Sequence, residues 1–200
     1  MTTKTRIYLI RHGEVEGAGT HRYNGHADVS LTERGVAQYH DLTKRFDDAR
    51  ITACYTSDLK RCVVGAEILG GHLGVAPVKE RNLRELHIGI WEGMTWTELQ
   101  AKYPEEWQAR LADIVNYRVP GGESLLDLKE RVTPFIAGIV ERHRGEEVLV
   151  IAHGGTNRVV LLNAMGTPLS GLFNIEQNYC CLNIIDYYED GKSVVKLLNG

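Results

Sequence analysis

The sequence is poor in the features that mark specialised protein classes. It has only four cysteines in 200 residues, two of them adjacent, and none in a Cys-x-x-Cys pair. The few cysteines, without metal-ligand spacing, predict reduced thiols. The sequence opens with a short polar segment that does not resemble a targeting signal, so we expect a cytoplasmic protein. No apolar run approaches the roughly 20 residues that a membrane-spanning helix needs.

The sequence also lacks a strong charge of either sign. Its formal net charge is −3, with 24% charged and 43% hydrophobic residues, which is the balance of an ordinary globular protein. We therefore expect neither nucleic acid nor a membrane as a partner, and any attraction for phosphate must be local. Because no linker, repeat or low-complexity stretch divides the chain, we predict one domain over residues 1–200.

What is present is an alternation of strand and helix patterns. Short apolar runs at 6–10, 51–56, 76–80 and 148–152 predict strands, and residues 180–188 and 193–198 around Glu-Asp-Gly-Lys predict a hairpin. Helices are predicted from Thr32 to about residue 46, from Asp58 to about 69 with Ser57 as N-cap, and over 124–143 behind a Ser124–Asp127 capping box. This order predicts an α/β sandwich around a mostly parallel sheet. Residues 86–122, which hold all three tryptophans, read as a lid-like insertion with helices at about 95–103 and 104–114.

Two predicted strands end in the same way. Residues 7–10 lead into Arg-His-Gly, and residues 148–152 lead into His-Gly-Gly. Ligands of open α/β sheets bind beyond the carboxyl ends of the strands, so neighbouring strands would bring His12 and His153 to one crevice. Glycine after each histidine would let the backbone approach a ligand closely.

Arginines complete a candidate phosphate site. Arg11 precedes the first histidine, and Arg61 lies in the first turn of a predicted helix, where a cation opposes the helix dipole unless an anion binds. Arginine forks match phosphate oxygens, and a neutral histidine can attack phosphorus to give a phosphohistidine. The cationic cage then supplies the charge stabilisation, so we expect no metal and no cofactor.

The missing group is a proton donor for the leaving alcohol. Glu85 follows the strand predicted at 76–80, and a carboxyl group beside a phosphate suits proton donation. Glu14 and Glu92 are rival candidates. We prefer Glu85 because it lies at a turn between apolar positions, whereas Glu92 belongs to the predicted insertion. His87, two residues further on, is an open candidate for substrate contact.

These residues belong to six blocks that resemble the histidine phosphatase superfamily, whose fold is called phosphoglycerate-mutase-like. The blocks are L-I-R-H-G-E at 9–14, N-G-H-x-D-x-x-L-T-x-x-G at 24–35, Y-T-S-D-L-x-R at 55–61, L-R-E-x-x-x-G-x-W-E-G at 83–93, P-G-G-E-S at 120–124 and A-H-G-G at 152–155. The resemblance implies a three-layer α/β/α sandwich without a metal. It also implies His12 as nucleophile, Glu85 as proton donor, and His153, Arg11 and Arg61 as phosphate ligands. We add Asn24, Gly25 and Gly154 from the same blocks to the predicted substrate-binding set.

The first loop departs from the pattern of the family. Val15 stands where Thr or Ser is common, Ala18 lies near a frequent phosphate-binding Asn, and Ser30 replaces a common Pro. The first two changes remove polar groups, so a weaker grip on phosphate is expected unless Asn24 compensates.

The resemblance favours a phosphatase over a phosphoglycerate mutase. Cofactor-dependent mutases are longer and carry a tyrosine just after the acidic residue, then a lysine and an arginine pair, whereas this chain has His87-Ile-Gly-Ile-Trp91 there. The blocks resemble phosphatases of α-ribazole 5′-phosphate, which act in cobalamin assembly, and broad-specificity acid phosphatases equally well. A catalytically inactive relative and a metal hydrolase using His21 and His26 are further alternatives. The expected partner is a small phosphomonoester, with a homodimer left open.

Overall fold

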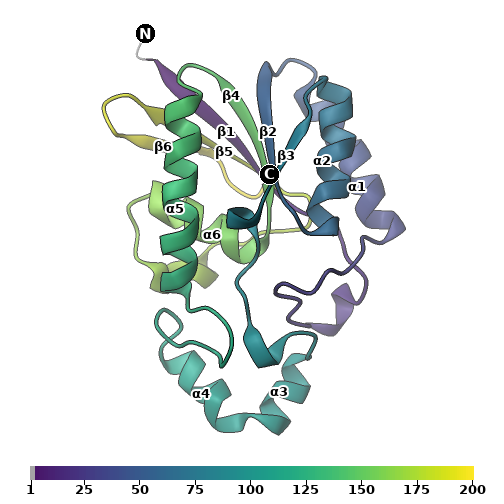
Figure 1. Cartoon of the computed structure of the whole chain (residues 1–200), viewed down its shortest axis with the longest axis vertical. Coiled ribbons are helices and arrows are strands. Elements are labelled where there is room, and N and C mark those ends of the chain that lie inside the picture. Colours follow the sequence, from purple (N-terminus) through teal and green to yellow (C-terminus); the bar gives the residue numbers. More distant parts are fainter. Residues whose placement is uncertain (1–2) are drawn as a thin grey trace.

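The computed structural model describes residues 3–200 and contains one six-stranded sheet with the strand order β3-β2-β4-β1-β5-β6 (Figure 1). Strands β3, β2, β4 and β1 run parallel, and β5 runs antiparallel to both of its neighbours, β1 and β6. The strands are β1 (Lys4–Arg11), β2 (Ile51–Ser57), β3 (Pro77–Glu80), β4 (Glu147–Ala152), β5 (Leu182–Tyr188) and β6 (Ser193–Leu197). The predicted strands and the final hairpin are therefore confirmed, with ends that differ by one or two residues.

Helices cover both faces of the sheet, which confirms the predicted three-layer α/β/α sandwich. Figure 1 shows α1 (Glu33–Thr43) and α2 (Lys60–Leu73) on one side and α5 (Leu125–Arg142) and α6 (Gly154–Ala164) on the other. Two separate cores fill the spaces between the layers. Within β1, Ile7 and Leu9 point into one core while Tyr8 and Ile10 point into the other, which is why the strand is apolar throughout.

Helix starts follow the predicted caps at two of three places. The Thr32 side chain accepts a hydrogen bond from the Gly35 amide, and Ser124 and Asp127 form the predicted capping box. The prediction for α2 was wrong: the helix begins at Lys60 after Leu59, not at Asp58 after Ser57. Both expected starting residues are engaged elsewhere, because the Ser57 hydroxyl bonds His153 and the Asp58 carboxylate pairs with Arg84.

The segment between β3 and α5, which includes the lid-like insertion predicted at 86–122 and is called the lid from this point, extends beyond the end of the sheet (Figure 1). It contains α3 (Trp96–Lys102) and α4 (Pro104–Ala112), close to the two predicted helices, and the short 3-10 turns η3 (Arg81–Leu83) and η4 (Gly89–Trp91). Trp91 and Trp107 are buried in the core, whereas Trp96 is 43% exposed. Two of the three tryptophans thus pack the segment against the domain, and one remains available to a ligand. Three further 3-10 turns complete the fold: η1 (Ala18–Thr20), η2 (Lys44–Phe46) and η5 (Leu169–Asn174).

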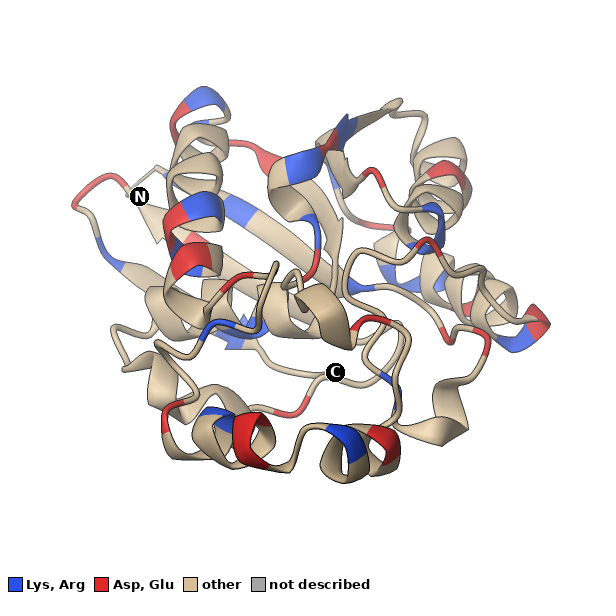
Figure 2. Cartoon of the chain, turned by 60° about the horizontal axis from the view of Figure 1, so that its bottom comes forward, with Lys and Arg blue, Asp and Glu red and all other residues tan. Residues whose placement is uncertain are grey.

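The outer helices carry charges of both signs. Figure 2 shows acidic and basic positions interleaved along α5 and along the α3–α4 pair, without a long stretch of one sign. Within residues 3–200, no helix combines the length and the apolar character that crossing a membrane requires.

Candidate active site

The two histidines lie at the carboxyl ends of adjacent strands. Strands β1 and β4 pair in parallel with Arg11 opposite Ala152, so the next residue of each strand is a histidine. The His12 amide donates a hydrogen bond to the Ala152 carbonyl at 3.0 Å, and the His12 and His153 rings lie 5.2 Å apart, edge to face. The predicted juxtaposition of the two strand ends is confirmed.

His12 is held in the tautomer that a nucleophile needs. Its Nδ1 lies 2.8 Å from the Gly13 carbonyl oxygen, which can only accept, so the proton sits on Nδ1 and the Nε2 lone pair is free. Burial holds the pKa of His12 well below its usual range, and the charges of Arg11 and Arg61 lower it further. The ring is therefore neutral at physiological pH.

Gly13 is required by the packing of two loops against each other. A Cβ at this position would lie 2.5 Å from the Gly35 carbonyl oxygen, and one at Gly35 would lie 2.1 Å from the Glu14 carbonyl oxygen. The two glycines let the loop after β1 press against the start of α1. This packing helps to fix the position of His12, while the expected role of Gly13 in ligand approach stays a prediction.

Arg61 is a buried cation held by neutral groups. It is 1% exposed and donates from Nη1 to the Ala27 carbonyl at 2.7 Å and from Nη2 to the Gly25 carbonyl at 2.8 Å. Its Nε donates to His153 Nδ1 at 3.2 Å. No carboxylate pairs with it among residues 3–200, and burial lowers its pKa. Such a site is prepared for an external anion.

Arg11 forms the opposite side of the cage. Its guanidinium lies 4.1 Å from the centroid of the Tyr179 ring, and its Nη1 donates to the Gln177 carbonyl. The buried Nε has no hydrogen-bond partner in the described chain. Stacking and one hydrogen bond thus position Arg11, and its Nε–H remains free to donate to a ligand.

His153 lies behind His12 rather than in the open crevice that we expected. It is completely buried, does not line the cavity, and has both ring nitrogens engaged. Because Arg61 donates to Nδ1, the proton sits on Nε2, which lies 2.8 Å from the Ser57 hydroxyl. Burial and the neighbouring Arg61 hold its pKa well below the usual range. Its part as a phosphate ligand stays a prediction, while its contact with Arg61 is direct.

Glu85 reaches the cavity and is fixed by the start of α6. Its two carboxylate oxygens accept hydrogen bonds from the amides of Gly155 at 3.0 Å and Thr156 at 3.1 Å. Gly155 makes this contact possible, since a Cβ there would lie 2.5 Å from Glu85 Oε1. The rivals lie elsewhere: Glu14 accepts from the Thr32 hydroxyl and Glu92 from the His26 amide, and neither lines the cavity.

The remaining predicted residues fall into two groups. Asn24 lines the cavity with a buried Oδ1 that no described residue contacts, and its part in substrate binding stays a prediction. Gly25 lines it too and holds Arg61 through its carbonyl. Gly154 is instead a spacer, because a Cβ there would crowd Arg158 at 3.3 Å and Arg11 at 3.4 Å.

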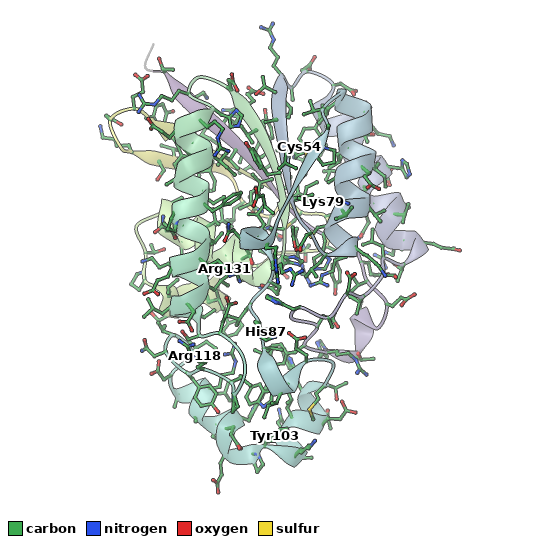
Figure 3. All side chains as sticks on the ribbon, in the orientation of Figure 1. Cys54, Lys79, His87, Tyr103, Arg118 and Arg131 are labelled. Carbon is green, nitrogen blue, oxygen red and sulfur yellow. The ribbon has the colours of Figure 1, made fainter. Side chains whose placement is uncertain are left out.

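Of the two altered positions Val15 and Ala18, only Ala18 lies at the cavity. Val15 is 1% exposed and pairs with Leu31, whereas Ala18 lines the cavity without a polar group. His87 lies outside the cavity, at the junction of the lid and the domain (Figure 3), with its ring 4.6 Å from that of His26.

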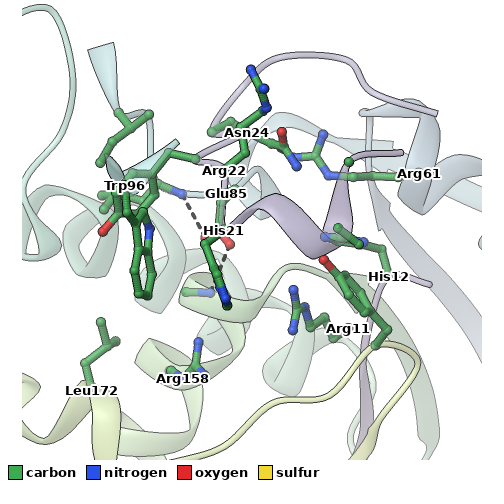
Figure 4. Close-up of a pocket in the computed structure, with 18 of the residues that line it drawn as sticks. Arg11, His12, His21, Arg22, Asn24, Arg61, Glu85, Trp96, Arg158 and Leu172 are labelled. Atoms are coloured by element: carbon green, nitrogen blue, oxygen red, sulfur yellow. Dashed lines mark hydrogen bonds between the residues drawn. The ribbon is translucent and has the colours of Figure 1, made fainter. Parts of the chain in front are cut away.

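The cavity encloses about 380 Å³ and runs from the strand ends to the lid. In Figure 4, His12, Arg11 and Arg61 lie at one end and Trp96 and Leu172 at the other. Its charged lining consists of five arginines and a single carboxylate: Arg11, Arg22, Arg61, Arg110, Arg158 and Glu85. The protein as a whole is acidic, so this concentration of positive charge is local, as the sequence predicted.

Several residues of this cavity are absent from the set predicted from sequence, among them Arg158, Arg110, Phe173 and Tyr179. Arg158 shares the signal that identified Arg61, a cation near the start of a helix after a strand, and could have been found by it. Arg110 and Phe173 lie far along the chain from any strand end, and Tyr179 precedes β5. Nothing in their local sequence distinguishes these three from surface residues.

Comparisons with known proteins agree with this site. The model of the histidine phosphatase superfamily (branch 1) matches residues 7–200. The chain is 34% identical to phosphoglycerate mutase-like protein 4 of Arabidopsis thaliana over 76% of its length and 67% of the relative's. It is 30% identical to the probable phosphoglycerate mutase GpmB of Yersinia pestis, covering 92% and 86% of the two chains.

Among solved structures, the α-ribazole phosphatase of Shigella flexneri superposes with a TM-score of 0.89. The two chains are 26% identical, and the match covers 98% of this chain and 96% of the other. The family match and the phosphatases among its structural neighbours confirm the predicted enzyme class, a phosphoric monoester hydrolase. The strand-end histidines, the fold and the family match agree: the chain belongs to the histidine phosphatase superfamily.

Proposed function

We propose that this protein hydrolyses phosphomonoesters of small metabolites through a phosphohistidine on His12, without a metal ion. The observation that carries the proposal is the tautomer of His12, whose Nδ1–H is committed to the Gly13 carbonyl. Its free Nε2 belongs to a cavity that also contains Arg11, Arg61 and Glu85.

The first step transfers the phosphoryl group to the enzyme. Nε2 of His12 attacks phosphorus, the bond from phosphorus to the ester oxygen breaks, and Glu85 gives its proton to the departing alcohol. Arg11 and Arg61 stabilise the charge on the non-bridging oxygens, which is the main demand of phosphoryl transfer. Gly13 keeps the ring aligned throughout, because its carbonyl holds Nδ1–H before and after the attack.

The second step returns the enzyme to its starting state. The Glu85 carboxylate takes a proton from a water molecule as that water attacks phosphorus, and the bond to His12 Nε2 breaks. Inorganic phosphate leaves, and Glu85 is protonated for the next cycle. The amides of Gly155 and Thr156 hold the carboxylate in one place for both transfers.

The substrate proposed from sequence, α-ribazole 5′-phosphate, remains one candidate. The name of the Shigella flexneri structure supports it, and so does the half-exposed Trp96, whose ring can stack on a base. Trp96 already stacks on His21 at 5.2 Å, so a base would extend an existing pair.

Turnover assays test the function directly. Purified protein should release phosphate from p-nitrophenyl phosphate in the presence of EDTA. No hydrolysis of any ester in a panel that includes α-ribazole 5′-phosphate and 3-phosphoglycerate would contradict the proposal, and activity lost in EDTA would contradict its metal-free form. With 3-phosphoglycerate, formation of 2-phosphoglycerate instead of free phosphate would identify a mutase, the activity in the name of the Yersinia pestis relative.

A further inference from the structure

Arg110 is a buried cation without a hydrogen-bond or ion-pair partner in the described part of the chain. It lies on α4, is 4% exposed, and its Nη1 has no hydrogen-bond partner among residues 3–200. No carboxylate of the described chain lies within 4.0 Å of its guanidinium. The central carbon of its guanidinium lies 6.0 Å from the centroid of the Tyr23 ring, a long cation–π contact.

Other inward-pointing arginines have more partners than Arg110: Arg11 also has a buried nitrogen without a partner in the described chain, but its Nη1 donates to the Gln177 carbonyl. Arg61 donates to two carbonyls and a histidine, and Arg158 donates from Nε to the Ile175 carbonyl at 2.6 Å. Arg131, at the base of the lid, pairs with Glu123 at 2.8 Å. A buried guanidinium without such partners loses solvation and gains little in return. Arg110 therefore has an unmet need for an anion.

Arg110 lines the same cavity as His12. The cavity is continuous from the phosphate cage to the lid, where Leu125, Ile88 and Trp96 supply apolar wall. Its single carboxylate, Glu85, is occupied by the amides at the start of α6 and serves the reacting end. A phosphomonoester alone would occupy the cage and leave the charge of Arg110 uncompensated.

We infer that Arg110 binds a second anionic group of the substrate, so that the preferred substrates are small phosphomonoesters that carry a carboxylate or a second phosphate at the end remote from the reacting group. This inference rests on the proposed function and narrows it. Arg110 acts on specificity: it holds the remote anion, while the apolar wall contacts the carbon skeleton between the two charges. Since α-ribazole 5′-phosphate has no second anion, it is disfavoured under this inference.

Matched pairs of synthetic esters test it. We would measure kcat/KM for alkyl phosphates with two to five methylenes that end in a carboxylate, and for partners of the same length that end in hydroxymethyl. A third series ends in a second phosphate and separates the two kinds of anion. Wild-type enzyme should prefer at least one anionic series, and Arg110→Met should reduce kcat/KM for that series roughly 10- to 100-fold, mainly through KM. The hydroxymethyl series and p-nitrophenyl phosphate should change less than about twofold, because neither reaches Arg110 with a charge.

A matched control comes from the same part of the chain. Arg118 is exposed, pairs with Asp127 and lies outside the cavity (Figure 3), so Arg118→Met should leave both series unchanged. Arg110→Lys should retain part of the preference, and retained turnover of p-nitrophenyl phosphate shows that each variant is folded.

The outcomes separate the two proposals. If wild-type enzyme cleaves no phosphoester, the proposed function fails. If it cleaves p-nitrophenyl phosphate but does not prefer anionic esters, or prefers α-ribazole 5′-phosphate to all of them, the inference about Arg110 is overturned while the function stands. Should Arg110→Met fail to fold, the substrate preference of the wild-type enzyme and of the Arg110→Lys variant still tests the inference about Arg110.

Discussion

The two ends of the cavity are built in different ways. At the phosphate end, His12 and Arg61 project from strand and helix ends in the body of the fold and are fixed by backbone carbonyls. At the remote end the walls come from the lid and from η5, where Trp96 is 43% and Phe173 65% exposed and Arg110 lacks a partner. The contrast indicates that the sheet fixes the chemistry, whereas attached segments select the substrate.

Removing the nucleophile is the most severe test of the phosphate end. His12→Ala should reduce turnover of p-nitrophenyl phosphate at least roughly 10⁴-fold, because no other group can form the covalent intermediate. Steady-state kinetics measure the loss, and His40→Ala, on the exposed side of α1, is the matched control and should keep full activity. Substantial turnover by His12→Ala would assign the attack to another group.

The proton donor should show a dependence on the leaving group. Glu85→Gln should slow hydrolysis of alkyl phosphates roughly 10²- to 10³-fold, and p-nitrophenyl phosphate much less, because nitrophenolate leaves without a proton. The measurement is kcat/KM over a series of esters whose alcohols differ in acidity. Equal losses for all of them would rule out the acid role, and a larger effect of Glu92→Gln would transfer it to that rival.

The neutral histidines of the phosphate end predict a pH dependence of stability. His12 and His153 stay unprotonated in the fold because burial lowers their pKa values, whereas in the unfolded chain they take up protons below about pH 6.5. The free energy of unfolding should therefore fall as the pH drops from about 6.5, by up to about 1.4 kcal/mol per pH unit for each histidine. Urea unfolding at pH 7.5, 6.5 and 5.5 measures the slope.

A variant provides the control for that slope. His153→Gln removes one of the two groups and should flatten the dependence even where it lowers stability overall. Stability that stays constant or rises as the pH falls through this interval would show that the histidines are protonated in the fold.

At the remote end, effects should be smaller and confined to binding. Trp96→Ala should raise KM for esters with aromatic alcohols by roughly 3- to 10-fold, since an aromatic contact contributes about 0.5–1.5 kcal/mol. kcat should change little, because Trp96 is remote from His12 in the cavity (Figure 4). Trp96→Phe, which keeps an aromatic face, is the control, and a loss in kcat comparable to that of Glu85→Gln would erase the distinction between the two ends.

The same contrast explains what could be predicted from sequence. The strands, the caps at Thr32 and Ser124 and the pairing of His12 with His153 depend on local patterns and on the rule that ligands bind at strand ends. The burial of His153 behind His12 depends on contacts with Ser57 and Arg61, which lie more than 90 residues away. Such contacts leave no periodic signal in the chain.

The residues of the remote end could not be predicted from sequence for a related reason. Arg110 reads as one charge on a surface helix, and only the packing of α4 reveals that its side chain is buried beside Tyr23. Arg158 could have been found from its place near the start of α6, but its confinement by the Ile175 carbonyl is a tertiary contact. Residues that determine specificity are thus harder to predict than residues that perform the chemistry, because their positions depend on how the inserted segments fold.

The central claim is that His12 Nε2 carries the phosphoryl group during turnover. Rapid quenching of the enzyme with a ³²P-labelled phosphomonoester, followed by peptide mapping, tests it most directly. We expect label that is labile in acid and stable in base, located on the peptide containing His12 and absent from His12→Ala. Label that is absent at all times during active turnover, or that is found on a different residue, would contradict it.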